Sequence, residues 1–180
     1  PTLMKKLLFV LIMLTPMIVL GQSNAQAIER TGDALQLLIP AIGLSSTIFL
    51  EQNQNGIKQF CKSLASNLII TQTLKLITKK RRPNGSCCTS FPSGHTSIAF
   101  MGAGFIHRRY SWKYSIPAYI GATFVGYSRV EANKHYVEDV IAGAAIGILS
   151  SLYFTTPYKG VVIFLNSNSG TYSMHIRRQI

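Results

Sequence analysis

Long apolar runs separated by short polar stretches dominate the pattern of this chain. Five of these runs predict helices, at residues 33–50, 56–78, 95–106, 114–128 and 140–156. Their middles carry almost no charge, and a membrane-spanning helix needs about 20 predominantly apolar residues. The pattern therefore predicts an all-α fold, a membrane-embedded bundle of five or six helices. A soluble all-α bundle is the alternative, because its buried helices have a similar pattern.

A sixth apolar run lies near the amino-terminal end. Two lysines precede the apolar residues 7–20, and a stretch of small residues ends in Ala-Gln-Ala at residue 27. This order is typical of a secretory signal peptide with cleavage after Ala27, and a retained first transmembrane helix is the alternative. The predicted organisation is a signal peptide or first transmembrane helix at 1–27, one domain at 28–157 and a C-terminal tail at 158–180.

Small residues recur at four-residue spacing within two of the predicted helices. They are Ala118, Ala122 and Gly126 in one helix, and Gly143 and Gly147 in the other. Small side chains at this spacing let helix backbones approach closely inside a bilayer. We therefore expect these faces to lie at helix contacts.

The tail has a different pattern from the rest of the chain. Residues 161–165 and 171–180 are typical of strands, and the polar residues 166–170 between them are typical of a turn. The tail therefore predicts a short β-hairpin.

Composition narrows the class of protein. The chain has 180 residues, of which 47% are hydrophobic and 13% charged, and its net charge is +12 from 18 Lys+Arg and 6 Asp+Glu. This hydrophobicity excludes a disordered or acidic tail protein. Basicity fits nucleic acid, anionic lipid or a phosphorylated substrate. Because the amino-terminal pattern directs the chain to export or to a membrane, we expect a membrane partner and no nucleic acid.

The charges of the loops bear on topology. If the first two lysines lie inside, the loop of residues 79–94 lies outside and residues 107–113 lie inside. The inner loop, with Arg108 and Arg109, follows the positive-inside rule. The outer loop, with four consecutive cations at 79–82, violates it. A basic outer loop requires a separate reason, and a bound anion supplies one.

Three polar clusters fall on this outer side. They read Lys75-x6-Arg82-Pro83, Pro92-Ser93-Gly94-His95 and Ser128-Arg129-x5-His135-x3-Asp139. Taken alone, each has a purely structural reading: headgroup anchors, a helix start, and a hydrogen bond between residues four apart on a helix. Only their combination points to chemistry.

Together the clusters predict a phosphate site. Lys75, Arg82 and Arg129 are three cations that can surround a phosphoryl group, and arginine offers a planar fork to its oxygens. Ser93 and Gly94 open a helix, where free N–H groups attract anions and glycine allows close approach.

Two histidines would supply the reactive groups. His135 is the candidate nucleophile, and Asp139 is expected to orient it through the other ring nitrogen. His95 remains to protonate the leaving oxygen.

The three clusters resemble the signature motifs of the type 2 phosphatidic acid phosphatase (PAP2) superfamily, which includes membrane lipid phosphatases, soluble acid phosphatases and vanadium haloperoxidases. The resemblance covers residues 75–139 and every signature position. It implies attack by His135 on phosphorus, a phosphohistidine intermediate, protonation by His95 and phosphoryl binding by the cations, Ser93 and Gly94. It implies no metal and no other cofactor.

For the membrane branch, the resemblance and the topology imply a multi-pass protein of the bacterial inner membrane with its active site facing the periplasm. The expected substrate is a lipid phosphate or diphosphate: undecaprenyl diphosphate, lipid A, phosphatidylglycerophosphate or phosphatidate. A soluble periplasmic acid phosphatase, a vanadium haloperoxidase and a non-enzymatic anion-binding protein are the alternatives. Eight residues separate Pro83 from Pro92, which leaves little room for a capping insert. The adjacent Cys87 and Cys88 are expected to be free or bonded between molecules.

Overall fold

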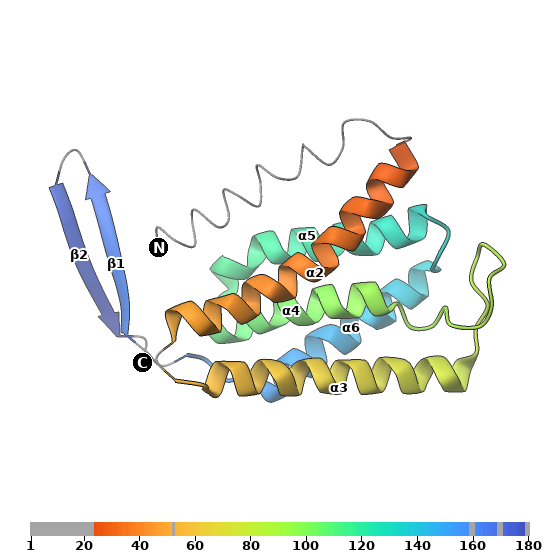
Figure 1. Ribbon diagram of the computed structural model, residues 1–180, viewed down its shortest axis with the longest axis horizontal. Helices are drawn as coiled ribbons and strands as arrows, with labels where there is room; N and C mark the ends of the chain where they lie inside the picture. The colour runs from red at the N-terminus through yellow and green to blue at the C-terminus, as the bar shows by residue number, and fades with distance from the viewer. Residues whose placement is uncertain (1–23, 52, 159–160, 169–170, 179–180) are drawn as a thin grey trace. The chain divides into compact units, whose positions relative to one another are not determined.

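The computed structural model describes residues 24–51, 53–158, 161–168 and 171–178. Within these residues the chain forms five helices and a hairpin (Figure 1). The helices are α2 (Asn24–Leu50), α3 (Asn55–Thr78), α4 (Gly94–Tyr110), α5 (Trp112–Glu131) and α6 (Val137–Phe154). The five predicted helices are confirmed, most of them to within four residues at each end. The apolar run at 7–20 lies outside the described residues.

Helix α2 differs most from its prediction, because it starts at Asn24 and not at residue 33. Two charged residues in its first turns, Glu29 and Arg30, interrupt the apolar pattern, so the predicted helix began after them. Glu29 forms an ion pair with Lys134, so its charge has a partner in the fold. The Ala-Gln-Ala sequence lies within the helix, and Ala27 is buried there. Cleavage after Ala27 is not tested by this arrangement and stays a prediction.

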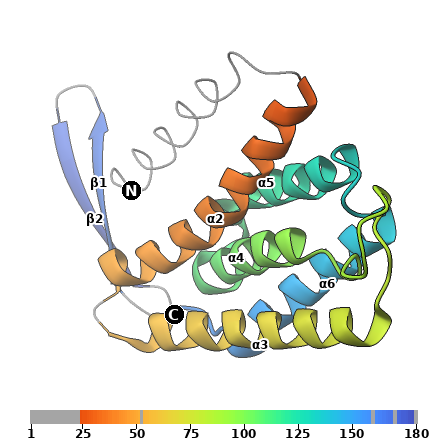
Figure 2. The same ribbon diagram turned by 45° about the vertical axis from the view of Figure 1, so that its right-hand side comes forward.

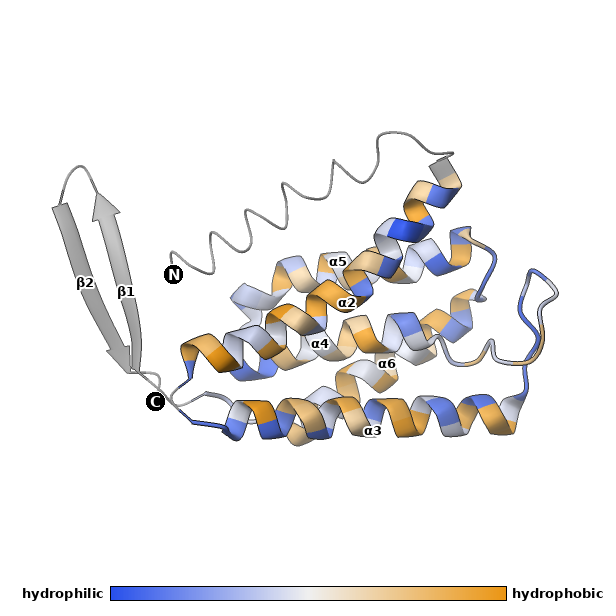
Figure 3. Cartoon of the chain, in the orientation of Figure 1, coloured by the Kyte–Doolittle hydropathy of each residue, from blue (hydrophilic) through white to orange (hydrophobic). Residues whose placement is uncertain are grey.

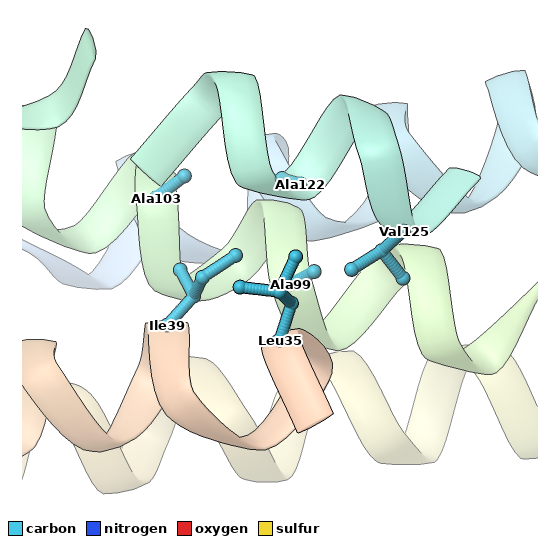
Figure 4. Close-up of a cluster of buried hydrophobic side chains, with 6 residues drawn as sticks. All are labelled: Leu35, Ile39, Ala99, Ala103, Ala122 and Val125. Carbon is cyan, nitrogen blue, oxygen red and sulfur yellow. The ribbon is translucent and has the colours of Figure 1, made fainter. Parts of the chain in front are cut away.

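Helix α4 is the central helix of the bundle. It contacts each of the four other helices, while α2 also packs against α5 and α3 packs against α6 (Figure 2). One apolar cluster joins α2, α4 and α5, and Figure 4 shows its side chains: Leu35, Ile39, Ala99, Ala103, Ala122 and Val125. Three of these six residues are alanines, which allows the three backbones to approach closely.

Glycines make the contact between α4 and α6. A Cβ atom on Gly143 would lie 2.5 Å from the carbonyl oxygen of Ser93. A Cβ atom on Gly147 would lie 2.7 Å from the Met101 nitrogen and closer still to the Ser97 carbonyl oxygen. The predicted close approach of backbones at these two glycines is therefore confirmed.

Polar side chains form part of the interior. Asn67 and Ser97 are buried and exchange two hydrogen bonds: the Asn67 amide nitrogen donates to the Ser97 carbonyl oxygen at 3.3 Å, and the Ser97 hydroxyl donates to the Asn67 side-chain oxygen at 3.0 Å. The hydroxyls of Thr71 and Ser97 lie 3.3 Å apart. These bonds hold α3 against α4 without a large apolar core.

Large apolar side chains lie on the outside instead. The most exposed include Leu37, Phe49, Ile69, Leu76, Ile77, Ile120, Ile141, Leu149 and Tyr153. Figure 3 shows hydrophobic residues along the helices and hydrophilic ones near their ends and in the loops. Two helices, at Ala25–Leu50 and Val137–Phe154, are long and apolar enough to span a bilayer. A small, polar interior with an apolar exterior suits a bundle solvated by lipid, where small residues and polar side chains make the helix contacts.

A buried ion pair closes the bundle end at which α2 and α4 finish. The Arg109 guanidinium donates to both carboxylate oxygens of Glu51, at 2.7 and 2.5 Å, and to the Thr156 carbonyl oxygen at 2.9 Å. The Tyr110 hydroxyl adds a hydrogen bond to Glu51 at 2.8 Å. The pair thereby joins the ends of α2, α4 and α6.

The tail forms the predicted hairpin. Strand β1 (Val161–Asn168) pairs antiparallel with β2 (Thr171–Arg178), and the register places Val161 opposite Arg178 and Asn168 opposite Thr171. The first strand therefore continues through residues 166–168, which the sequence pattern had assigned to the turn.

Candidate active site

The three clusters meet at the bundle end opposite the Glu51–Arg109 pair. Their residues lie on the ends of α3, α4, α5 and α6 and on two loops, residues 79–93 and 132–136. The loops are joined by a hydrogen bond from the Asn84 amide to the Asn133 carbonyl at 3.0 Å. A second bond, from the Ser93 amide to the Asp139 carbonyl at 2.9 Å, joins the start of α4 to α6. Both bonds fix the clusters relative to one another.

The first cluster brings Lys75 and Arg82 to the same residue. The Lys75 ammonium donates to the Thr89 carbonyl oxygen at 2.6 Å, and the Arg82 guanidinium donates to the Thr89 hydroxyl at 3.2 Å. The Arg82 Nε atom is buried without a hydrogen-bond partner among the described residues. One guanidinium donor of this cluster therefore remains available for an anion.

The second cluster forms the start of α4. Ser93 is buried and is the N-cap residue: its hydroxyl oxygen accepts a hydrogen bond from the Thr96 amide at 3.4 Å and lies 2.9 Å from the Thr96 hydroxyl. The side chain of Ser93 is thus engaged with the helix. At Gly94, the nearest atom to an added Cβ would be the Lys75 Cε at 3.8 Å. The start of α4 therefore lies against the Lys75 side chain at van der Waals distance.

In the third cluster, Arg129 is held almost entirely inside the protein. Its side chain is 1% exposed, and its three nitrogens donate to Asp33 Oδ1 at 2.7 Å, to the Glu29 carbonyl oxygen at 2.8 Å and to the Ser128 hydroxyl at 3.1 Å. Two of these acceptors belong to α2. Three of the five guanidinium N–H groups are used in this way, so the others remain for a ligand.

His135 has a partner that the sequence did not indicate. Its Nδ1 atom lies 2.7 Å from the carbonyl oxygen of Ser90, whereas the nearest Asp139 carboxylate oxygen is 3.7 Å away. The prediction of a direct hydrogen bond between His135 and Asp139 is therefore wrong. A carbonyl oxygen can only accept, so Nδ1 carries the proton, and the lone pair of neutral imidazole lies on Nε2.

Asp139 acts on His135 through Ser90. Its fully buried carboxylate accepts hydrogen bonds from the Ser90 hydroxyl at 2.5 Å, the Tyr136 amide at 3.0 Å and the Lys80 ammonium at 2.8 Å. The Ser90 amide donates to the Lys80 carbonyl oxygen at 3.0 Å. Ser90 is thus fixed at its side chain and its backbone, which fixes the carbonyl that holds His135.

The surroundings keep His135 neutral. Burial lowers its pKa to about 4, and the positive charges of Lys75 and Arg82 act in the same direction; the Ser90 carbonyl and Asp139 oppose them. For Lys80, burial lowers the pKa, but the hydrogen bonds to Asp139 and Glu138 outweigh it and raise the pKa overall. At neutral pH the site therefore combines a neutral histidine with charged lysine and arginine side chains.

His95, the second residue of α4, has a partner on α2. Its Nε2 atom lies 3.3 Å from Asp33 Oδ1, the same oxygen that accepts from Arg129. Asp33 carries no signal in the sequence, because it stands alone at the edge of an apolar run, 62 positions before His95. The structure brings the two together where α2 crosses the start of α4.

The bonding of the two adjacent cysteines differs from the prediction. The sulfur atoms of Cys87 and Cys88 are bonded to each other, and Cys61 is free and exposed. They were expected to be free or bonded between molecules. The bonded pair lies in the loop between Arg82 and Thr89.

A membrane helix bundle with a neutral histidine, a second histidine and several cations at one end defines a class: a membrane enzyme for phosphoryl groups. The model of the PAP2 superfamily matches residues 56–160, more than half of the chain, and the chain belongs to this superfamily. The predicted membership and the predicted class of enzyme, a phosphatase, are confirmed, and the chain is a membrane protein.

Several characterised proteins resemble the chain. A lipid A 4'-phosphatase of Helicobacter pylori is 30% identical over 76% of the chain and 73% of its own length. A lipid A 1-phosphatase of Porphyromonas gingivalis is 45% identical over 38% of the chain, which matches 16% of that protein. A bacitracin transport permease of Bacillus licheniformis is 41% identical over 36% of the chain and 31% of its own length.

Two crystal structures share the fold. LpxE of Aquifex aeolicus superposes with a TM-score of 0.60 at 20% identity, over 79% of this chain and 93% of that chain. A transmembrane PAP2-type phosphatidylglycerolphosphate phosphatase of Bacillus subtilis superposes with a TM-score of 0.52 at 20% identity, over 84% and 93% of the two chains. These likenesses confirm the all-α PAP2 architecture.

Proposed function

We propose that the protein hydrolyses a phosphate group from a membrane lipid through a phosphohistidine on His135, without a metal ion. The observation that carries this proposal is the bond from His135 Nδ1 to the Ser90 carbonyl. It leaves the Nε2 lone pair for attack on phosphorus, and the low pKa keeps that lone pair free at neutral pH.

The other residues have distinct roles in this reaction. His95 protonates the departing oxygen and then takes a proton from the water that hydrolyses the intermediate. Asp139 positions His135 through Ser90. The phosphoryl oxygens are bound by Lys75, Arg82, Ser93, Gly94 and Arg129. Because Ser93 uses its side chain as a cap, its contribution comes from the backbone at the start of α4.

The proposed setting is the bacterial inner membrane, crossed several times, with the active site facing the periplasm. Residues 28–157 form the phosphatase domain in this proposal. The exposed apolar side chains of the helices support an embedded bundle. A site at the membrane surface explains the embedding, because acyl chains can stay in the bilayer while the headgroup reaches the cations.

Among the expected substrates we favour a phosphate of lipid A. The support is the resemblance to two lipid A phosphatases, one of them along most of its length. Undecaprenyl diphosphate, phosphatidylglycerophosphate and phosphatidate are the substrates against which this preference is tested.

The deciding experiment measures phosphate release by the purified protein in detergent with a chelator present. Lipid A, undecaprenyl diphosphate, phosphatidylglycerophosphate and phosphatidate are compared with a soluble aryl phosphate, and His135→Ala is the matched variant. We expect release from lipid A to be fastest and to fall at least 10³-fold in the variant, because a nucleophile is lost.

Other outcomes point to other functions. Equal rates for wild type and His135→Ala would contradict the phosphohistidine route. A preference for the soluble aryl phosphate would indicate a non-specific acid phosphatase. Peroxide-dependent halide oxidation after addition of vanadate would indicate a haloperoxidase.

A further inference from the structure

One oxygen of Asp33 bridges two residues of the candidate site. Asp33 Oδ1 lies 2.7 Å from an Arg129 guanidinium nitrogen and 3.3 Å from His95 Nε2. Asp33 comes from α2, whereas the other two side chains come from α5 and α4. It belongs to none of the three sequence clusters, so the family motifs give it no role.

The contact to His95 is specific within a basic environment. Arg129, Lys134 and Arg82 all place positive charge near His95, and Asp33 is the carboxylate that contacts the ring. Glu29, one helical turn before Asp33, pairs with Lys134 instead. The two acids of this helix face therefore contact different partners: Asp33 contacts His95 directly, whereas Glu29 acts on His95 only through its charge.

Close packing holds Asp33 in place although 45% of its side chain is exposed. A Cβ atom on the preceding residue, Gly32, would collide with the Ser128 hydroxyl and lie 2.8 Å from an Arg129 nitrogen. Helix α2 thus lies directly against α5 at this point. The backbone that carries Asp33 has no room to approach further, and the bond to buried Arg129 fixes its carboxylate.

We propose that Asp33 is a positioning residue that sets which nitrogen of His95 moves the proton; this rests on the proposed hydrolysis. A carboxylate only accepts, so it favours a proton on the nitrogen that faces it, Nε2. None of the described residues donates to or accepts from His95 Nδ1. Asp33, on α2, therefore keeps a proton on Nε2 of His95. The Nδ1 atom of His95 is left to exchange a proton with the substrate.

The proton balance of both steps follows from this assignment. In the first step His95 starts with a proton on each ring nitrogen. The His135 Nε2–phosphorus bond forms, the bond from phosphorus to the lipid oxygen breaks, and the His95 Nδ1 proton passes to that oxygen, which leaves a neutral ring with its proton on Nε2. In the second step a water oxygen attacks phosphorus, the phosphorus–nitrogen bond breaks, and one water proton returns to Nδ1. The Nε2 proton stays beside Asp33 throughout.

Leaving-group dependence tests the role of Asp33. Lipid A has a poor leaving oxygen that needs a proton, whereas 4-nitrophenol leaves readily as an anion. In Asp33→Asn we expect kcat for lipid A to fall about 10- to 100-fold and kcat for 4-nitrophenyl phosphate to fall less than about threefold, since general acid catalysis contributes ~10²- to 10⁴-fold. Asp33→Glu should recover part of the lipid A rate.

Glu29→Gln is the matched control, because it removes a carboxylate from the same face of α2 and keeps the direct contact between Asp33 and His95. Both of its rates should stay within about twofold of wild type. An equal loss on the two substrates in Asp33→Asn would overturn the proposal, since Asp33 would then act through Arg129 and phosphate binding. Unchanged rates would overturn it as well.

A second measurement does not depend on activity. In ¹⁵N-histidine-labelled protein, with His95 assigned by His95→Gln, the nitrogen shifts report which ring nitrogen carries the proton. At a pH where the His95 ring is neutral, we expect the Nε2–H form in wild type and in Glu29→Gln, and a loss of that preference in Asp33→Asn. An Nδ1–H form in wild type would overturn the inference. If wild type releases no phosphate from any substrate, the proposed function fails, while this spectrum still decides the role of Asp33.

Discussion

A backbone atom orients His135, the proposed nucleophile. The Ser90 carbonyl oxygen accepts a hydrogen bond from His135 Nδ1 at 2.7 Å, and the carboxylate of Asp139 accepts one from the Ser90 hydroxyl. A carbonyl oxygen is uncharged and cannot take the proton away, so the ring keeps one definite tautomer. Burial and the nearby charges of Lys75 and Arg82 also lower the pKa of His135 to about 4. Together they support the proposal that His135 acts as a nucleophile at neutral pH.

The pH dependence of kcat/KM should reflect this pKa. Because the His135 pKa lies near 4 and below the ordinary 6.5, the nucleophile stays unprotonated down to mildly acidic pH. We expect the acidic limb of a kcat/KM profile to have its midpoint near pH 4. A midpoint near 6.5 would contradict the assigned surroundings of His135.

The lowered pKa of His135 also makes the stability of the fold depend on pH. Between pH 6.5 and 4 the unfolded chain binds a proton at His135 and the folded chain does not. Stability should therefore be highest above pH 6.5 and fall as the pH drops toward 4. Unfolding midpoints of wild type and His135→Gln, compared at several pH values, measure this contribution.

Lys80 provides a second test at the scale of single residues. Lys80→Met removes the cation that contacts buried Asp139, and an unpaired buried carboxylate is costly. Because Lys80 is partly exposed, we expect a loss of only about 1–2 kcal/mol in stability. The kcat should fall about tenfold as Ser90 loosens. Lys79→Met, at the exposed neighbouring lysine, is the control and should change neither quantity.

At the scale of elements, the α4–α6 contact depends on glycine. Gly147→Ala would bring a Cβ atom against backbone atoms of Ser97 and Met101, which cannot move aside without shifting α4. We expect a loss of about 1–3 kcal/mol, the usual cost of overpacking, measured by thermal unfolding in detergent.

Gly121→Ala is the matched control for this contact. It is also a helical glycine, but its added Cβ would meet side-chain atoms and no backbone: Ile39 Cδ1 at 3.2 Å and Leu35 Cδ2 at 3.9 Å. Alanine favours the helix by up to about 1 kcal/mol, so this variant should be neutral or stabilised. If both variants lost the same stability, the glycine contact would have no special role.

The helices could be predicted because their signal is local. Each predicted run is 12 to 23 residues long, which is too long for an ordinary strand and indicates a helix without reference to distant residues. The start of α2 could not be predicted in this way. Glu29 and Arg30 interrupt the apolar run, and the ion pair that accommodates Glu29 reaches Lys134, 105 positions away. The balance that keeps this segment helical therefore lies in the tertiary structure.

The residues of the candidate site also differ in whether a local signal in the sequence indicates them. Its histidines and cations could be predicted because their residue types and spacing carry the chemistry. Ser90 could not, because it acts through a carbonyl oxygen that every residue has. Asp33 and Lys80 could not, because a single charge beside an apolar run or within a basic stretch carries no signal of its distant partner.

At the scale of the whole molecule, orientation can be measured directly. In a variant without native cysteines, Arg81→Cys marks the site end of the bundle and Lys113→Cys marks the opposite end; both positions are exposed. We expect a membrane-impermeant maleimide to label Arg81→Cys in intact spheroplasts and Lys113→Cys only after lysis. Labelling in the reverse order would place the site in the cytoplasm.

The ion pairs of the bundle leave the protein short of counter-ions. Of its six acidic residues, five lie against a cation of the chain itself: Glu29, Asp33, Glu51, Glu138 and Asp139. The surplus of twelve positive charges has almost no carboxylate left to balance it. The counter-charge must therefore come from outside the chain, and anionic lipid headgroups at the membrane surface are one source of it.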